Sequence, residues 1–411
     1  MSGAQRRVLL FILLTVALDS MGMGILSPVT PKLILELSGA GLAQAAIYGG
    51  WLTAAFAAMQ FVAGPILGSL SDRLGRRPVL LASLAAFGLS YVLMGLAPTL
   101  AWLFVAQLLT GLFGATPATA GAYIADVTPP AQRARHFGSL AAAFGTGLII
   151  GPAAGGLLSA HGTRVPFFAA AALSLLTVVY GVIALPESLK PELRRAFSWR
   201  RANPIGAIGA LRRRAVVGML LAAVFLQRVS TTALPAIWPY FTMQEYGWTP
   251  RQIGYSLAIF GVATVLFQVG VLRWLDAHLG TRRAAILGLA ASAVGFLGFA
   301  FLRGPWIVAT CIPLTTLGFM AGPALAGMLS VRIAADAQGM LQGVMASING
   351  VAVVLTPLVM PWIFSVFSTG RAPLVFPGAP YVLSAVLSLL GVWCIRRGST
   401  PDRRDHLTQP A

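Results

Sequence analysis

Long apolar stretches recur along almost the whole chain, and this repetition limits the fold more than any other feature of the sequence. About 20 helical residues cross a hydrocarbon layer of roughly 30 Å. Of the 411 residues, 57% are hydrophobic and 10% are charged, and the mean hydropathy is +0.81. We therefore predict an all-α integral membrane protein. The twelve predicted transmembrane helices occupy residues 8–28, 44–68, 78–97, 100–123, 137–160, 165–185, 214–240, 250–273, 283–302, 305–330, 338–365 and 376–396.

The basic residues predict the topology. The net charge is +18, but these residues are not gathered in a soluble domain, so we expect no nucleic-acid partner. If the N-terminus is cytoplasmic, only Lys32, Arg164, Arg251, Arg303 and Arg371 fall on the opposite side. Both termini are therefore predicted to be cytoplasmic. The cytoplasmic side then receives Arg6, Arg7, Arg73, Arg76, Arg77, Arg133, Arg135, the cluster at 190–214, Arg273, Arg282, Arg283, Arg332, Arg396, Arg397, Arg403 and Arg404.

The sequence offers few groups for metal or covalent chemistry. Cys311 and Cys394 both lie in predicted spans and show no metal-ligand spacing. No nucleophile and base form a recognisable pair. We expect no metal site, no bound cofactor and no enzyme. The four histidines, His136, His161, His278 and His406, are equally scattered.

The two halves of the chain look like copies of each other, as in secondary transporters with a binding site between their halves. We predict pseudo-symmetric six-helix bundles at 1–188 and 214–397. A basic cytoplasmic linker at 189–213 would rest on anionic headgroups, and 398–411 would form a cytoplasmic tail. Three pairs of identical residues lie 205 positions apart, namely Gly75 and Gly280, Gly138 and Gly343, and Pro152 and Pro357.

One acid stands near the middle of the first predicted span. Asp19 lies eleven residues after Val8, close to the bilayer midplane, where a carboxylate is costly and usually kept for function. Arg228, in the seventh span, lies one helical turn beyond the repeat-related position Val224. We hypothesise that Asp19 and Arg228 form a charge pair, directly or through water, which protonation of Asp19 weakens. Alternatively, Arg228 snorkels or binds an anionic substrate while Asp19 fixes helix packing.

The loop between the second and third predicted spans contains a glycine, an aspartate four residues later, and then a glycine among basic residues. This order resembles the signature of the major facilitator superfamily, and a weaker copy lies at 276–283. We expect Gly68 to allow close helix approach, and the arginines either to bridge neighbouring helices or lipid phosphates or only to enforce topology. Asp126 either joins the loop as a cytoplasmic latch or is solvated. The predicted gating residues are Gly68, Asp72, Arg73, Gly75, Arg76, Arg77 and Asp126.

The fifth predicted span carries a glycine every four residues, at Gly147, Gly151 and Gly155. Such spacing leaves one helix face without side chains, so a neighbouring backbone can approach, while Pro152 is expected to bend the helix. Together with Gly156, this passage is similar to the motif of antiporters in the superfamily. It is either a plain packing seam or a seam that shifts between two states.

Longer passages resemble the tetracycline/proton antiporter branch in particular, closely in the N-terminal half and loosely in the C-terminal half. They are residues 18–31, 72–81, 121–126, 133–138, 166–173 and 185–188. The resemblance implies exchange of a cationic metal–tetracycline complex for a proton. Members of this branch carry an acid in the third helix, an arginine in the fourth and an acid in the ninth. Here the corresponding residues are Ser90, Gln107 and Ala291 or Ser292, all uncharged.

Other polar residues in apolar spans are candidates for a substrate cavity, because each can either bond across helices or face the substrate. Four aromatic residues toward span ends, Trp51, Trp238, Tyr240 and Trp248, either bind an aromatic drug or, more commonly, form an interfacial belt. The predicted cavity residues are Gln60, Gln107, Gln227, Gln268, Gln342 and Asn349.

The features together predict a multi-pass exporter of the bacterial inner membrane with the major facilitator fold. It would couple inward proton movement to efflux of a drug-like amphiphile by alternating access, with tetracycline, free or metal-chelated, as the leading substrate. The proton gradient would be its energy source. The alternatives are a proton-coupled transporter of another small metabolite or drug, and a non-transporting membrane receptor or scaffold.

Overall fold

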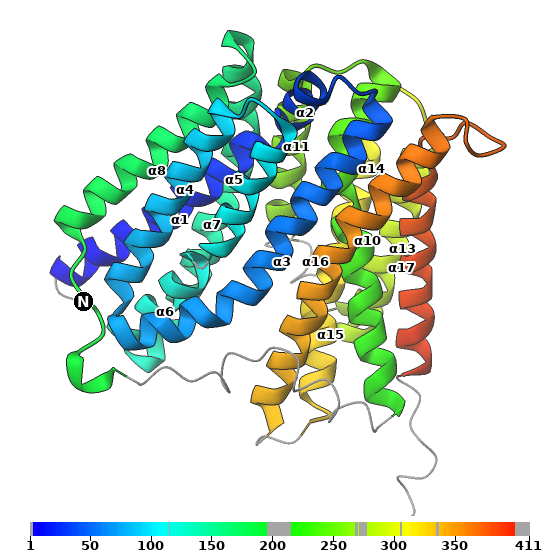
Figure 1. The fold of residues 1–411 in the computed structure, drawn as a ribbon. Helices are drawn as coiled ribbons and strands as arrows, with labels where there is room; N and C mark the ends of the chain where they lie inside the picture. Colours follow the sequence, from blue (N-terminus) through cyan, green and yellow to red (C-terminus); the bar gives the residue numbers. More distant parts are fainter. Residues whose placement is uncertain are drawn as a thin grey trace, which may run out of the picture. The chain divides into compact units, whose positions relative to one another are not determined.

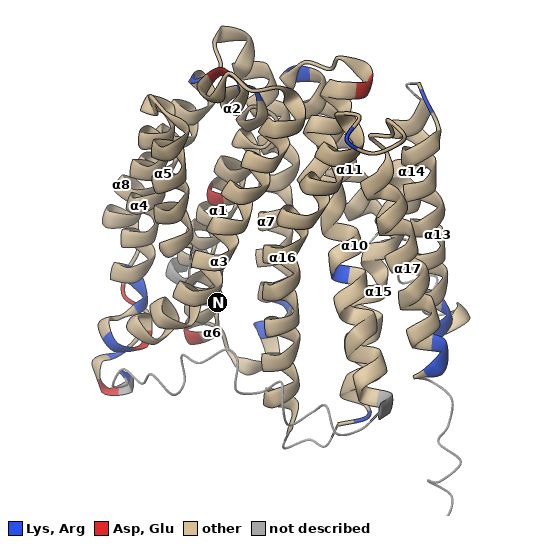
Figure 2. Ribbon diagram, turned by 45° about the vertical axis from the view of Figure 1, so that its right-hand side comes forward, with Lys and Arg blue, Asp and Glu red and all other residues tan. Residues whose placement is uncertain are grey.

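The structure is a computed structural model that describes residues 3–114, 116–194, 215–267, 270, 278–304, 306–333 and 337–398. Every regular element in these ranges is helical (Figure 1). Most of the predicted linker and tail lies outside the described residues. In Figure 2 the Lys and Arg residues gather mainly near helix ends, while most of each helix carries no charge. This distribution is expected when apolar side chains face lipid.

Ten helical stretches among the described residues are long and apolar enough to cross a membrane. At the remaining predicted positions, the fourth span is divided into α5 (Leu100–Leu112) and α6 (Thr116–Val127), and the eighth begins as α11 (Pro250–Leu266). A count of twelve therefore stays a prediction. The ten stretches contain α1 (Gly3–Leu26), α3 (Leu42–Leu74), α4 (Arg76–Leu96), α7 (Pro130–Leu158), α8 (Val165–Ala184), α10 (Ala215–Tyr246), α13 (Thr281–Phe301), α14 (Trp306–Leu317) joined through η4 (Gly318–Met320) to α15 (Ala321–Ser330), α16 (Gln338–Ser368) and α17 (Ala379–Arg397).

A short helix, α2 (Thr30–Ser38), follows α1 and lies outside the predicted spans. Pro31 stands in its first turn, where a missing N–H costs nothing, and Gly39 ends it with φ of +63°. Leu33 and Ile34 are fully buried. An apolar pattern of only nine residues is too short for a span, so α2 is not among the predicted helices.

The chain forms two compact units, and neither is one sequence half. The first comprises Met1–Asn203, Pro235–Val265 and Val354–Pro377; the second comprises Pro204–Leu234, Leu266–Val353 and Gly378–Ala411. The first unit thus combines the N-terminal helices with the end of α10, most of α11 and the end of α16. The predicted division at 188 and 214 stays a prediction.

Each unit has its own apolar core. In the first unit α1 packs along α7 and α8, and α4 packs along α8. One of its clusters joins Phe11 and Val16 of α1 to Leu84 of α4 and Ile124 of α6. In the second unit α13 packs against α17 and α14. Its cluster draws on α10, α13, α15, α16 and α17.

Candidate functional site

Asp19 is buried in α1, with an exposed fraction of 6%. Within the described part of the chain, no hydrogen bond or ion pair reaches its carboxylate. Thr15, one turn earlier on the same face, also has a buried hydroxyl without a partner among the described residues. Leaving buried polar groups unpaired costs free energy, so packing alone does not explain this polar patch.

Tyr91 of α4 lies against the α1 turn that contains Asp19. A methyl group added at Gly22, three residues after Asp19, would lie 3.3 Å from Cε2 of Tyr91 and 3.5 Å from its hydroxyl oxygen. The Tyr91 side chain is 2% exposed, and its hydroxyl has no partner among the described residues. The ring of Tyr91 stacks on Phe87, which holds it in place. Tyr91 therefore brings a buried aromatic hydroxyl against the turn of α1 that follows Asp19.

The glycines of the fifth predicted span bring α7 into backbone contact with α1. Gly147, Gly151 and Gly155 share one face of α7. A methyl group at Gly151 would lie 2.6 Å from the carbonyl oxygen of Met21 and 2.8 Å from Cα of Gly24, and methyl groups at the other two would overlap the α1 backbone as well. The expected close approach is present, and the neighbour is the helix that carries Asp19.

A different side of α7 meets α11, which belongs to the C-terminal half of the sequence. A methyl group at Gly156 would lie 2.9 Å from the carbonyl oxygen of Pro250 and 3.0 Å from Cα of Arg251. From the other helix, a methyl group at Gly254 would overlap the carbonyl of Pro152. Thus α7 packs against α1 and α11 through small residues on two sides.

A second contact between sequence halves lies on α3, also within the first unit. The hydroxyl of Tyr240 on α10 occupies the space that a side chain at Gly49 would need. Gly50 likewise faces the carbonyl of Pro357 and the ring of Pro361 on α16. These contacts lie near the helix ends that the predicted topology, which stays a prediction, assigns to the side opposite the cytoplasm.

The predicted gating loop forms a network of charges around Arg76. The Arg76 guanidinium contacts Asp72, one turn earlier, and Asp126 of α6, with Nε 3.2 Å from Oδ2. It also donates to Ser71 Oγ at 2.7 Å. The contact between Asp126 and the loop is present, whereas its role in gating stays a prediction. Arg73 is exposed.

Glu187, which follows α8, caps the beginning of α4. Its carboxylate accepts the backbone N–H groups of Arg76 at 2.9 Å and Arg77 at 3.2 Å. These N–H groups have no partner inside the helix, and the helix dipole favours an anion at this end. Arg77 donates to the Val182 carbonyl at 2.7 Å, which also ties α4 to α8.

The two loop glycines have different roles. We expected Gly68 to allow close helix approach, and this was wrong for this structure: a methyl group there would meet no described atom within 4 Å. Gly75 has φ of +112°, and a methyl group there would overlap the Glu187 carboxylate. The turn between α3 and α4 therefore requires glycine at Gly75.

Replacing Gly75 with alanine should destabilise the protein by about 1–3 kcal/mol, because alanine rarely adopts this φ. The matched control is Gly68→Ala, which adds the same methyl group inside α3 and should leave stability unchanged or raise it by about 1 kcal/mol. Melting temperatures of both variants in detergent, measured by fluorescence-detected size exclusion, check this. Equal melting temperatures would show that the turn tolerates a side chain.

Arg228 lies half-buried on α10, and its carbonyl accepts the hydroxyl of Thr232 at 2.7 Å. It belongs to the second unit, whereas Asp19 belongs to the first. Their charge pair therefore stays a prediction.

Two of the predicted cavity residues bond across helices. Gln60 of α3 donates to the carbonyl of Gly114 at 3.0 Å, which satisfies the backbone at the break between α5 and α6. Gln227 of α10 is 1% exposed and donates to the carbonyl of Gly318 at 3.2 Å, although its Oε1 has no described partner. Both side chains therefore have a structural role, because each bonds to the backbone of another segment. Of the others, Gln107 and Asn349 are half-buried, Gln342 is exposed, and Gln268 lies outside the described residues.

Two of the four aromatic residues are not part of an interfacial belt. Trp238 is 2% exposed and donates its indole N–H to Ser256 at 2.8 Å. Tyr240 is 5% exposed. Trp51, in contrast, is 49% exposed, as a belt residue would be.

Comparison with known proteins now identifies the family. The sequence model of the Major Facilitator Superfamily matches residues 12–236 and 220–410. The chain belongs to the Major Facilitator Superfamily. The class C tetracycline resistance protein of Escherichia coli is 37% identical over 395 residues, covering 96% of this chain and 98% of the relative.

Other comparisons agree with this membership. Multidrug resistance protein 2 of Bacillus subtilis (strain 168) is 29% identical over 397 residues, covering 95% of this chain and 96% of the relative. The crystal structure of the nucleoside transporter NupG matches with a TM-score of 0.79 at 13% identity, covering 96% of this chain and 100% of that one. The predicted major facilitator fold is confirmed, and the chain is a multi-pass membrane transporter, not an enzyme.

Two of the uncharged residues that stand where the tetracycline branch carries charges are buried in packed helices. Ser90 is 1% exposed, and Ser292 is fully buried and donates to the Thr315 carbonyl at 3.4 Å. Among the described residues, no group of three His, Cys, Asp or Glu side chains could hold a metal ion. The helix α4 contains no Asp or Glu, so Asp19 on α1 has no acidic partner there.

Two residues at these sites are not among the predicted site residues. Glu187 lies within 185–188, a passage that resembles the tetracycline branch, but its pairing with the start of α4 spans more than a hundred residues. Tyr91 directly follows Ser90, the position at which the acid of the third helix is missing. An aromatic hydroxyl in an apolar span was the signal that could have found it.

Proposed function

We propose that this protein exports a drug-like amphiphile in exchange for protons by alternating access, with tetracycline as the leading substrate. The proposed location is the bacterial inner membrane, with both termini in the cytoplasm and the proton gradient as the energy source. The observation that carries the proposal is the burial of Asp19 on the helix that α7 holds by backbone contact.

Asp19 is the proposed proton-binding group. A carboxylate buried in a span is stable only when it is protonated or paired, so its protonation state is coupled to the surroundings of α1. In the proposed cycle Asp19 pairs with Arg228 in one state and takes up a proton in the other. Tyr91 would hold the carboxyl group in position by hydrogen bonding.

Alternating access requires the contacts between sequence halves to separate in part of the cycle. The pairs Gly49–Tyr240 and Gly156–Arg251 lie at helix ends that the predicted topology assigns to the outer side. We propose that they close the outer side in the described state. Glycine suits this role, because it has no side chain of its own and lets the Tyr240 hydroxyl and the Arg251 backbone approach closely.

The substrate proposal is supported by relatives named tetracycline resistance proteins, at 33–37% identity over most of the chain. Because the positions of Ser90, Gln107 and Ala291 are uncharged, the charges proposed to meet the substrate or the proton are Asp19 and Arg228. The Bacillus multidrug resistance relative favours a second candidate, export of another amphiphilic drug through the same proton cycle.

Tetracycline uptake into inverted membrane vesicles tests the proposal. With an imposed pH gradient, acidic inside, vesicles containing the protein should accumulate tetracycline above vesicles from cells carrying an empty vector, and collapsing the gradient should stop accumulation. Assays with and without Mg²⁺ would separate free from metal-chelated tetracycline. No accumulation under either condition would exclude tetracycline and direct the same assay to other amphiphiles.

A further inference from the structure

Four hydroxyl groups in the core of the first unit have no hydrogen-bond partner among the described residues. Their side chains are at most 1% exposed. Other buried threonines in the helices, such as Thr110 and Thr177, donate to the carbonyl four residues earlier in their own helix. Within the described ranges none of the four makes such a bond, so each is an unsatisfied buried polar group. They belong to Thr15 of α1, Ser83 of α4, and Thr116 and Thr119 of α6.

The helices α4 and α6 place their hydroxyls at one depth. Arg76, at the beginning of α4, contacts Asp126 near the end of α6, so these two helices run in opposite directions. Ser83 lies seven residues after the arginine, and Thr119 lies seven residues before the aspartate. Both hydroxyls are therefore about 10 Å along their helices from that ion pair.

The helices α1 and α4 run in the same direction, which brings Thr15 to this depth. Leu81 and Phe11 lie against the same glycine of α8: a methyl group on it would be 2.6 Å from Cδ2 of the first and 3.1 Å from Cζ of the second. Further along both helices, Tyr91 lies against Gly22. Thr15 and the α4 serine lie between these two contacts, no more than about one helical turn beyond the first.

The faces that carry these hydroxyls meet in one apolar cluster. On α1, Thr15 shares its face with Asp19, one turn later. Ser83 and Thr119 lie one turn from buried cluster members on α4 and α6, and Thr116 lies one turn deeper, toward the depth of Asp19. The four residues thus form one hydroxyl column that ends beside Asp19. The cluster members next to it are Phe11, Leu80 and Tyr123.

At its other end the hydroxyl column leads to the surface. The hydroxyl of Tyr123, one turn beyond Thr119, donates to the carbonyl of Pro186 at 2.6 Å. Pro186 and the following Glu187 are exposed. Polar groups therefore follow one another from the turn of Asp19 to the end of the helices that carries the Arg76 network.

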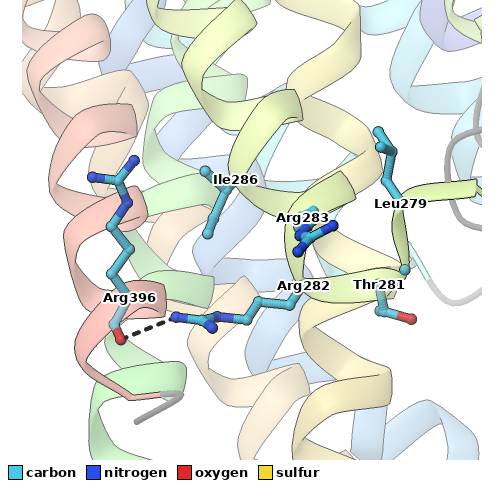
Figure 3. A pocket seen from close by; sticks show the side chains of 7 residues that line it. Leu279, Thr281, Arg282, Arg283, Ile286 and Arg396 are labelled. Carbon is cyan, nitrogen blue, oxygen red and sulfur yellow. Dashed lines mark hydrogen bonds between the residues drawn. The ribbon is translucent and has the colours of Figure 1, made fainter.

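The second unit shows that packing does not require hydroxyls at these positions. In Figure 3, Arg282 at the beginning of α13 donates to the backbone carbonyl of Arg396 on α17 at 3.5 Å. Arg77, its repeat partner 205 positions earlier, makes the same kind of bond to α8 in the first unit. The residues 205 positions after the hydroxyl column and Asp19 have neither a hydroxyl nor a carboxyl group, and all but the glycine lie in one buried apolar cluster. They are Leu220, Gly288, Ala321, Ala324 and Val224.

We infer that the hydroxyl column binds water molecules and forms with them the path by which the Asp19 proton leaves toward the predicted cytoplasmic side. A buried water makes about three hydrogen bonds to polar groups that otherwise lack partners. In each transfer an oxygen of the path receives one proton and gives up another, so the hydroxyls end unchanged. The Asp19 carboxyl becomes a carboxylate, and the proton passes to water beside Pro186. The inference rests on the proposed role of Asp19 as the proton-binding group, but not on tetracycline as the substrate.

Exchange of the Asp19 carboxyl proton for deuterium tests the path directly. Infrared spectroscopy of the full-length protein in lipid vesicles, transferred from H2O to D2O at acidic pH, follows the carboxyl C=O band that disappears in Asp19→Asn. Ser83→Ala and Thr119→Val should each slow the shift of this band roughly tenfold, because each removes one hydrogen-bonded link of the path. Thr119→Ser keeps the hydroxyl and should exchange at the native rate.

The matched control is Thr110→Val, which removes a buried hydroxyl that already has a partner on its own helix and should leave exchange unchanged. Melting temperatures in detergent confirm that each variant is folded. Native exchange rates in both Ser83→Ala and Thr119→Val would overturn the inference, and so would the absence of an Asp19 carboxyl band at acidic pH. Equal slowing in Thr110→Val would also overturn it, because the effect would then be a general one.

Vesicle uptake separates failure of the path from failure of the proposed function. If tetracycline is transported, Thr119→Val should lower the initial rate of gradient-driven uptake roughly tenfold and leave gradient-free exchange intact. If native protein accumulated no tetracycline while Thr119→Val still slowed deuterium exchange, the substrate would be wrong and the path would stand. If Thr119→Val changed neither uptake nor deuterium exchange, the path would be wrong and the exporter would stand.

Discussion

Replacing Asp19 with asparagine should abolish gradient-driven tetracycline uptake into inverted vesicles while leaving gradient-free exchange of tetracycline intact. Asparagine keeps the size and most of the hydrogen bonding of the protonated acid but cannot bind and release a proton. The buried carboxyl has no described partner whose loss would unfold the helix, so the variant should be inserted and folded. Uptake is measured with radiolabelled tetracycline, and exchange is measured after preloading the vesicles without a pH gradient.

Two further variants test whether the loss of uptake is due to the loss of proton binding. Asp19→Glu keeps a titratable group one methylene further out and should retain part of the uptake. Tyr91→Phe removes only the hydroxyl and should displace the pH dependence of uptake while changing exchange little, because the stacking on Phe87 survives. If Asp19→Asn accumulated tetracycline as the native protein does, Asp19 would have no part in coupling. If Asp19→Asn also lost gradient-free exchange, the Asp19 carboxyl would be needed for substrate binding and not for proton coupling.

The parts of the fold that could be predicted depend on patterns local in sequence. A run of about 20 apolar residues in a membrane satisfies its backbone by forming a helix, and ten of the twelve predicted spans correspond to span-length helices among the described residues. Glycine every fourth residue in α7 required a close neighbour, whatever that neighbour was. The helix α2 could not be predicted in this way, because nine residues with Pro31 in the first turn and Gly39 at the end are too few for a span-length apolar pattern.

The partners of the polar groups could not be predicted, because they are distant in sequence. Gln60 was equally suited to a substrate cavity and to a helix break, and only the position of the Gly114 carbonyl decides between them. Tyr240 looked like a belt residue from its place near a span end, yet its hydroxyl is packed against Gly49. Spacing along one helix gives the face on which a residue lies but not the helix that covers that face.

Replacing Gly151 with alanine should lower the stability of the protein by about 3 kcal/mol and reduce uptake and exchange together. The added methyl group would lie 2.6 Å from the carbonyl oxygen of Met21 and 2.8 Å from Cα of Gly24. Both obstacles are backbone atoms, which cannot rotate away, so α1 and α7 must separate. Because Asp19 is on the displaced helix, transport should fall in every mode, unlike in Asp19→Asn.

The matched control for Gly151 is Gly138 on the same helix, where a methyl group would meet no described atom within 4 Å. Alanine gains about 1 kcal/mol of helix propensity at either position, so the difference between the two variants isolates the contact with α1. Melting temperatures in detergent and both vesicle assays measure that difference. If the two variants melted together, the seam between α1 and α7 would be looser than the structure shows, and α7 would no longer account for how α1 holds Asp19 in place.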